Sequence, residues 1–212
     1  MRFLTAYYSI QEGRSITLTG SDRMKQRPIG VLVDALNQLG ADISYLENPG
    51  FPPLKINGKK ITTSKITIPA NVSSQYITAL MLIGTQLQNG LTITLEGKII
   101  SVPYIQMSIQ LLKRIGVEAE MIGQEIKVNY TPNVEPKTLQ VESDWSSASY
   151  YYSLVALSPN SEISISTYFE DSLQGDSALQ TIYQDNFGVE STFANGKLTL
   201  KNHPEFDYPD VI

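Results

Sequence analysis

A short basic segment of this sequence could bind a small anion. Residues 20–28 begin with a glycine and carry three cations, Arg23, Lys25 and Arg27, ahead of a predicted helix whose first turn holds Pro28. An arginine can grip a carboxylate or phosphate through two parallel hydrogen bonds, and the amino terminus of a helix adds favourable partial charge. An ordinary basic loop has the same composition, so both interpretations stay open at this point.

A second polar cluster, formed by Ser73, Ser74 and Gln75, precedes a predicted apolar helix. Its two hydroxyls, its amide and the free backbone N–H groups of the helix start are suited to hold a phosphate without a metal. Serine is also a common N-cap, and capping alone would account for both serines. The cluster by itself therefore does not decide between a ligand site and a helix start.

Two further places have both a chemical and a structural interpretation. Ser101 stands before a helical pattern with Pro103 in its first turn, and a capping role explains it fully. Glu142 and Asp144 could form a carboxylate pair, or they could share one face of a strand. The basic segment, the serine cluster and Ser101 all fall at predicted strand-to-helix junctions, where α/β proteins place binding sites. These residues alone predict an α/β repeat protein that binds a small anionic ligand.

Self-similarity at a long period organises the chain. Gly40, Gly116 and Gly188 each end a helical pattern and open a strand, at spacings of 76 and 72 residues. Ser73 and Ser146 each precede an apolar helical stretch, at a spacing of 73 residues. Because these markers agree on one period, we expect three copies of one structural unit.

The pattern inside one copy predicts its elements. Apolar spacing predicts strand, helix, strand, helix, strand and strand over residues 65–68, 76–87, 91–95, 101–115, 118–122 and 125–128. The fold class is therefore α/β (α+β), built from repeated strand-helix-strand-helix-strand-strand units. We expect the first copy to lack its opening strand, because the chain starts with a helical pattern, and a further helix to be cut off at its apolar end. The polar stretch 131–136 predicts a linker between domains 1–136 and 137–212.

Composition removes several classes of protein. The chain has 212 residues, a formal charge of −5, no cysteine and one histidine. The charge argues against a nucleic-acid surface, and the missing cysteines exclude disulfides and thiolate metal sites. A Ser-His-Asp triad would depend on His203, which lies in a polar segment. Without an apolar run of about 18 residues or a hydrophobic leader, we expect a soluble cytoplasmic protein that does not span a membrane.

Several sequence motifs of this chain resemble those of the 3-phosphoshikimate 1-carboxyvinyltransferase family. Five segments match in order and spacing: Arg23–Gly30, Val72–Leu80, Ser101–Ile105, Val141–Tyr150 and Ser172–Asp176. The resemblance implies an enzyme of two similar lobes, each of three such units, that closes around its substrates. Domain 1–136 would be most of one lobe, and domain 137–212 would be the first unit of the other.

The resemblance also implies a reaction and its site residues. The enolpyruvyl group of phosphoenolpyruvate (PEP) moves to the 5-hydroxyl of shikimate 3-phosphate through a tetrahedral intermediate, and phosphate is lost without a metal or organic cofactor. Arg27 would bind PEP, and Gln75 would touch both substrates. The residues that would hold shikimate 3-phosphate carry hydroxyls: Ser73, Ser74, Ser101 and Tyr104. Asp210 matches the catalytic aspartate, for which a helix N-cap is the alternative.

The sequence also departs from the family. An amino-terminal Lys-Ser pair with a nearby Arg, and carboxyl-terminal Asn, Lys, Glu and Arg residues, have no counterpart here. Because transition-state stabilisation needs those groups together, we expect weak binding and negligible turnover from this chain alone, and a monomeric full-length enzyme. Trp145 stands where the family has a small residue.

Three rival interpretations share the repeat. The sister enzyme that transfers enolpyruvate to UDP-N-acetylglucosamine usually has a catalytic-loop cysteine, which this sequence lacks. A noncatalytic module of the same repeats would bind a ligand without turnover. RNA-end cyclases are disfavoured by the negative charge and by the missing histidines.

Overall fold

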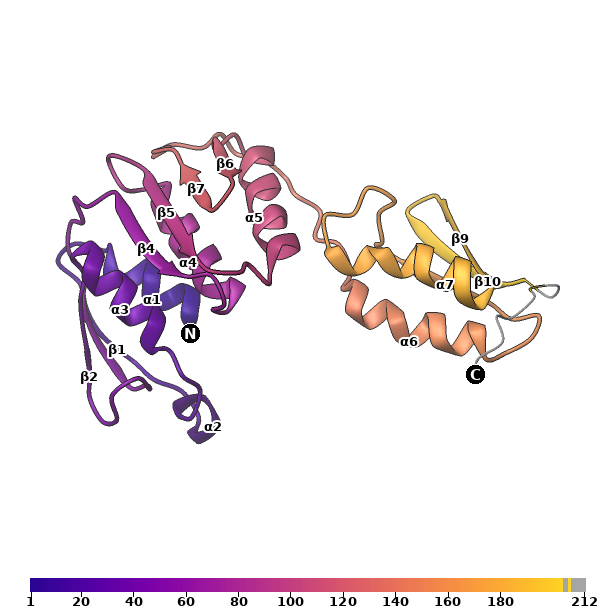
Figure 1. The fold of residues 1–212 in the computed structure, drawn as a ribbon, viewed down its shortest axis with the longest axis horizontal. Coiled ribbons are helices and arrows are strands. Elements are labelled where there is room, and N and C mark those ends of the chain that lie inside the picture. The colour runs from indigo at the N-terminus through magenta and orange to yellow at the C-terminus, as the bar shows by residue number, and fades with distance from the viewer. Residues whose placement is uncertain (204–205, 207–212) are drawn as a thin grey trace. The chain divides into compact units, whose positions relative to one another are not determined.

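The computed structural model describes residues 1–203 and 206, and the chain divides into two compact units, Met1–Pro136 and Lys137–Ile212 (Figure 1). The boundary falls at the end of the polar segment 131–136, which contains no helix or strand. Within the described residues, no helix is long and apolar enough to cross a membrane. The two units are described separately below.

The larger sheet of the first unit has the strand order β4-β5-β7-β6. Strands β4 and β5 pair in parallel, and the other neighbours pair antiparallel. In chain order the elements are β4 (Lys65–Pro69), α4 (Ser74–Gly84), β5 (Leu91–Glu96), α5 (Val102–Arg114), β6 (Ala119–Ile122) and β7 (Glu125–Val128). The strand-helix-strand-helix-strand-strand order predicted for one copy is therefore confirmed.

Burial explains why these segments take these forms. Residues of β4 alternate between exposed and buried, as expected for a strand with one face on a core. Helix α4 buries seven of its eleven residues, and it approaches the sheet closely at Gly84. A Cβ added at Gly84 would lie 2.9 Å from the Leu91 Cβ, so glycine permits this contact.

The smaller sheet of the first unit has the order β1-β3-β2, with antiparallel pairs throughout. The chain runs through α1 (Arg2–Ser9), β1 (Ser15–Leu18), α2 (Asp22–Lys25), α3 (Gly30–Leu39), β2 (Asp42–Tyr45) and β3 (Leu54–Asn57). The predicted helical pattern at the start of this copy is confirmed as α1, which precedes β1. The buried residues of α3 lie at helical spacing and join the same core as those of α4.

The second unit repeats the pattern from its first helix onward, around a separate core, and no strand precedes that helix in residues 137–144. Its elements are α6 (Trp145–Ala156), β8 (Glu162–Ser166), the 3-10 helix η1 (Gly175–Ala178), α7 (Leu179–Phe187), β9 (Val189–Ala194) and β10 (Lys197–Asn202). The sheet order is β8-β10-β9, and both pairs are antiparallel. Trp145, Tyr152, Leu198 and Leu200 are fully buried in its core.

The repeated glycines that mark the period have a common backbone conformation. Gly40 and Gly188 are the C-caps of α3 and α7, with φ values of 104° and 60°. Gly116, directly after the C-cap of α5, has a φ of 94°. Each helix of this set therefore ends in the left-handed region, which glycine enters without steric cost.

One expectation about the second unit is wrong. Glu142 and Asp144 do not alternate on a strand, because residues 141–144 form no strand. The Ser143 N–H donates to the Thr167 carbonyl at 2.7 Å, which is a single backbone contact and no ladder. Asp144 instead caps α6, since its carboxylate accepts from the Ser146 N–H at 3.1 Å. The two carboxylates therefore have separate structural roles.

The Glu142 carboxylate joins the start of α6 to the loop after β8. One oxygen accepts from Trp145 Nε1 at 2.7 Å and from the Phe169 N–H at 3.0 Å. The other accepts from Ser172 Oγ at 2.7 Å and Gln174 Nε2 at 3.1 Å. Trp145 is therefore held by a hydrogen bond as well as by packing, which gives this large residue a physical reason at a position where the motif suggested a small one.

Candidate anion-binding site

Arg27 lies in the connection between α2 and α3, where the chain is held at two points. The Ile29 N–H donates to the Gly50 carbonyl at 2.9 Å, and the Pro28 carbonyl accepts from Tyr76 Oη at 2.7 Å. Ile29 is the N-cap of α3, so Pro28 precedes the helix, and the prediction that Pro28 lies in its first turn is wrong. The Tyr76 bond ties this connection to the first turn of α4.

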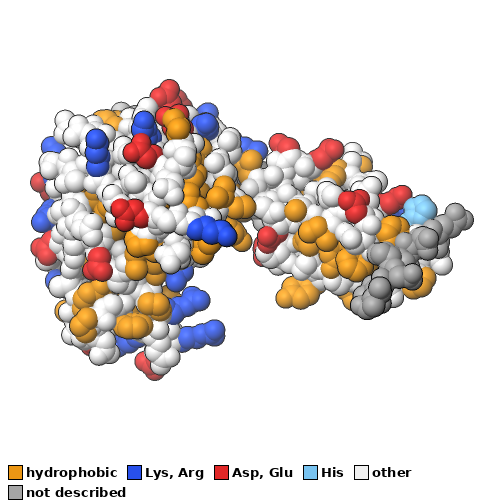
Figure 2. Space-filling view, in the orientation of Figure 1, with side chains coloured by type: hydrophobic (Ala, Val, Ile, Leu, Met, Phe, Trp, Pro, Cys, Tyr) orange, Lys and Arg blue, Asp and Glu red, His pale blue; other side chains and the backbone are white. Residues whose placement is uncertain are grey.

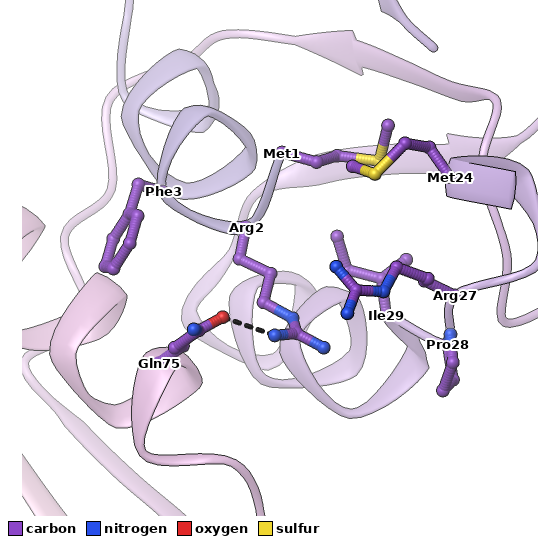
Figure 3. A pocket seen from close by; sticks show the side chains of 8 residues that line it. All are labelled: Met1, Arg2, Phe3, Met24, Arg27, Pro28, Ile29 and Gln75. Atoms are coloured by element: carbon purple, nitrogen blue, oxygen red, sulfur yellow. Dashed lines mark hydrogen bonds between the residues drawn. The ribbon is translucent and has the colours of Figure 1, made fainter. Parts of the chain in front are cut away.

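A small pocket forms where α1, this connection and α4 meet (Figure 3). Its volume is about 150 Å³, which fits a small ligand better than a drug-sized one. Eight described residues line it: Met1, Arg2, Phe3, Met24, Arg27, Pro28, Ile29 and Gln75. The lining therefore contains two guanidinium groups and one amide, and none of the eight residues is acidic.

The charge balance of this pocket is positive. Within the described residues, neither Arg2 nor Arg27 forms an ion pair, whereas the neighbouring Lys25 pairs with Glu47 at 3.1 Å. Cationic side chains project from the first unit around α2 in Figure 2. Because Arg27 is not neutralised by a described carboxylate, its bidentate donors are available to an anion.

Arg2 is a pocket residue that the sequence interpretation did not select. Its Nη1 donates to Gln75 Oε1 (Figure 3). Its guanidinium lies 5.1 Å from the centroid of the Tyr76 ring. An arginine in the first turn of a predicted helix is usually expected to be exposed to solvent, so the sequence did not indicate a binding role for Arg2. Since 73 positions separate Arg2 from Gln75, no local signal pointed to this contact.

The serine residues lie at the starts of two neighbouring helices. Ser73 is the N-cap of α4 and Ser101 is the N-cap of α5, and neither makes a side-chain capping bond within the described residues. The predicted position of Ser101 as an N-cap is therefore confirmed, but no capping hydrogen bond within the described residues occupies its hydroxyl. The two helices follow β4 and β5, which are parallel neighbours, so both serines lie beyond the same edge of the sheet.

The structure brings only part of the predicted set together. Arg27 and Gln75 line one pocket, but Ser73, Ser74, Ser101 and Tyr104 do not line it. Tyr104, in the first turn of α5, is half exposed, and Ser74 begins α4. Helices α4 and α5 are linked by the Thr78 and Ser108 hydroxyls, 2.9 Å apart.

One predicted site residue has no described geometry. Asp210 lies outside the described residues, so its predicted role stays a prediction. Across residues 1–203 and 206, no group of three histidine or carboxylate side chains could hold a metal ion. The chemistry that the described site supports is recognition of a small anion by arginine and amide donors.

Comparison with known proteins decides the family. A sequence model of EPSP synthase (3-phosphoshikimate 1-carboxyvinyltransferase) matches residues 1–205. The chain belongs to the EPSP synthase family. It is 47% identical over 205 residues to the 3-phosphoshikimate 1-carboxyvinyltransferase of Bacteroides fragilis, which covers 96% of this chain and 49% of that protein. The corresponding protein of Colwellia psychrerythraea is 37% identical over 206 residues and is covered to 48%.

Solved structures share the fold of this chain. EPSP synthase from Acinetobacter baumannii matches with a TM-score of 0.71 at 19% identity, over 95% of this chain and 46% of that one. The enolpyruvyl transferase NikO from Streptomyces tendae matches with a TM-score of 0.63 at 16% identity, over 94% and 46%. These similarities confirm the fold class. The chain spans about half the length of the EPSP synthase relatives that it matches.

Proposed function

We propose that this chain is part of a 3-phosphoshikimate 1-carboxyvinyltransferase. The enzyme transfers the enolpyruvyl group of PEP to the 5-hydroxyl of shikimate 3-phosphate and releases phosphate. The observation that carries the proposal is the pocket of Arg2, Arg27 and Gln75 in a chain of the EPSP synthase family. Both substrates carry phosphate, and the Arg27 guanidinium, which no carboxylate of the described residues neutralises, favours such ligands.

Arg27 and Gln75 are proposed to bind PEP. This substrate carries a phosphate and a carboxylate close together, so several N–H donors in one small pocket can bind both groups. Arg27 supplies a planar fork of donors, and the Gln75 amide, exposed at the pocket rim, can reach a second ligand as well. We therefore assign Gln75 to both substrates.

Shikimate 3-phosphate is proposed to bind beyond the edge of the sheet where α4 and α5 begin. The side chains assigned to it carry hydroxyls at those helix starts: Ser73, Ser74, Ser101 and Tyr104. Hydroxyls that make no capping bond within the described residues can donate to a phosphate or a sugar-like hydroxyl, and the backbone N–H groups of the first turns add to them. If the Ser73 and Ser101 hydroxyls were bonded to their own helices, they would not be available to a ligand, so the lack of capping bonds supports their assignment to shikimate 3-phosphate.

The proposed chemistry is addition followed by elimination. The 5-hydroxyl oxygen attacks the enol carbon of PEP, the methylene carbon takes a proton, and the tetrahedral intermediate then loses phosphate and a proton from its methyl group. Asp210 is assigned acid-base work at the reacting hydroxyl, because a carboxylate within hydrogen-bond reach can take its proton. No metal or organic cofactor enters this proposal.

The proposal also assigns the two units to the lobes of the complete enzyme. Unit Met1–Pro136 is most of one lobe, and unit Lys137–Ile212 carries the first repeat of the other. The remaining repeats would come from the part of the enzyme beyond the half that this chain spans. We place the enzyme in the cytoplasm and propose that it acts as a monomer.

Calorimetric titration of this chain with shikimate 3-phosphate and with PEP tests the proposal. The test variant is Ser73→Ala with Gln75→Ala, and the matched control is Ser158→Ala with Gln180→Ala in the second unit. Hydrogen bonds to a charged ligand are each worth roughly 1.5–3 kcal/mol, so the test variant should bind shikimate 3-phosphate at least about tenfold more weakly. The control should bind like the parent chain.

Two outcomes would contradict the assignment. Equal affinity of the parent and the test variant would remove Ser73 and Gln75 from the site. Binding of UDP-N-acetylglucosamine without binding of shikimate 3-phosphate would favour the sister enzyme, which the comparisons do not favour.

A further inference from the structure

The contact between Arg2 and Gln75 determines which end of the Gln75 amide faces the pocket. A guanidinium group has five N–H donors and no acceptor, so it can bond only to the amide oxygen. Arg2 Nη1 does donate to Gln75 Oε1. The Gln75 NH2 group is therefore left as a donor in a pocket that Gln75 and Arg27 both line (Figure 3).

The Arg2 side chain is itself held in place by Tyr76. Its guanidinium lies over the Tyr76 ring at 5.1 Å from the centroid, within the range of a cation–π interaction. Tyr76 is buried, and its hydroxyl donates to the Pro28 carbonyl at 2.7 Å, next to Arg27. One aromatic side chain therefore holds the Arg2 guanidinium and anchors the connection that carries Arg27.

We propose that Arg2 is a positioning residue of the PEP site, which orients the Gln75 amide as a hydrogen-bond donor to the anion. This inference rests on the proposed function, and it adds a residue that acts through Gln75 rather than on the ligand. Without Arg2, the Gln75 amide can rotate by half a turn and present its oxygen, which repels an anion. The Arg27 contact with the ligand does not depend on this orientation.

The first measurement is the NMR spectrum of the Gln75 side-chain NH2 group in the full 212-residue chain, assigned by its loss in Gln75→Ala. The test variant is Arg2→Met, and Arg14→Met is the control, because Arg14 is exposed and lies outside the pocket. Arg2→Met should move the Gln75 NH2 signals, and Arg14→Met should leave them in place. Unchanged Gln75 signals in Arg2→Met would overturn the contact.

The second measurement is titration with PEP in a double-mutant cycle. Arg2→Met should weaken PEP binding by about threefold to tenfold, because the misoriented Gln75 amide no longer donates its hydrogen bond to the anion. In a Gln75→Ala background the same substitution should change affinity by less than about twofold. Arg2→Lys, which keeps a cationic donor, should weaken binding less than Arg2→Met does.

The outcomes separate this inference from the proposed function. An equal loss of affinity in both backgrounds would mean that Arg2 contacts the anion directly, and the positioning role would be wrong. If the parent chain does not respond to PEP, the assignment of PEP to this chain fails. The Gln75 signals in Arg2→Met would still decide whether Arg2 orients the amide.

Discussion

Replacing Glu142 by Gln should destabilise the second unit substantially. The Glu142 carboxylate accepts four hydrogen bonds of 2.7–3.1 Å, two at each oxygen. A glutamine keeps one oxygen and turns an NH2 group towards the other pair of donors. On the side of Ser172 and Gln174, the serine hydroxyl can reverse and accept, but the Gln174 NH2 then faces another NH2 group.

The expected cost follows from that count. One partly buried donor left without an acceptor costs about 1–3 kcal/mol, and the remaining bonds lose the extra strength of a charged acceptor. We therefore expect the free energy of unfolding of this unit to fall by about 2–3 kcal/mol. For a domain of this size, a loss of 2 kcal/mol lowers Tm by roughly 8–16 °C.

The assay can isolate this unit because Trp145 is the only tryptophan in the chain. Its indole is fully buried and bonded to Glu142, so its fluorescence should change when the second unit unfolds. Urea and thermal unfolding followed at the tryptophan signal then report the second unit within the full chain. Glu190→Gln is the matched control, because Glu190 is exposed on β9 and makes no side-chain hydrogen bond within the described residues.

The result that would refute this reasoning is a small effect. If Glu142→Gln lowers stability by no more than Glu190→Gln does, the four hydrogen bonds contribute little to the fold. The carboxylate would then be free for another role, and the earlier interpretation of Glu142 as part of a chemical pair would have to be reconsidered.

Two further predictions concern one tyrosine and one glycine. Burial raises the pKa of Tyr152 to about 12, although its 2.7 Å hydrogen bond with Ser191 acts in the opposite direction. The folded state therefore favours the neutral phenol, and this contribution to the free energy of unfolding is complete below pH 10 and is lost as pH rises from 10 through 12. Because the pKa of Tyr168 in the same unit is also raised by burial, the test is the difference between two chains: Tyr152→Phe should reduce the loss of stability between pH 10 and 12 by up to about 1.4 kcal/mol per pH unit. Equal slopes for the parent and Tyr152→Phe in tryptophan-monitored unfolding would contradict this. Gly84→Ala should lower the stability of the first unit by about 1–2 kcal/mol, because the new Cβ would lie 2.9 Å from the Leu91 Cβ, and circular dichroism can measure the loss. A gain in stability, as helix propensity alone would give, would show that the sheet yields at this contact.

The order of helices and strands was predictable because it depends on local signals. Apolar spacing in residues 65–128 gave each element of one repeat within a few residues of its observed bounds. Gly40, Gly116 and Gly188 marked the period because a helix that ends in the left-handed region favours glycine at that position. The same local signals misplaced Pro28, whose backbone neighbour Ile29 is held by a bond to Gly50.

Residue identity by itself also determined the family and most of the proposed site. Motifs around Arg27, the serine cluster and Ser101 are short and contiguous, so their chemistry can be recognised without a fold. What the sequence left open was whether the hydroxyls of those serines are used in capping. Ser73 and Ser101 are the N-caps of α4 and α5, but neither hydroxyl makes a capping hydrogen bond within the described residues.

Only the tertiary structure decided the contacts between distant positions. Arg2 meets Gln75 across 73 residues, Tyr76 reaches Pro28 across 48, and Glu142 gathers donors as far away as Gln174. Periodicity reports which face of an element is buried, but it does not report which side chains of other elements lie opposite. Those partners are set by how helices and strands pack, and for that reason the anion pocket, unlike the repeat, could not be predicted in full.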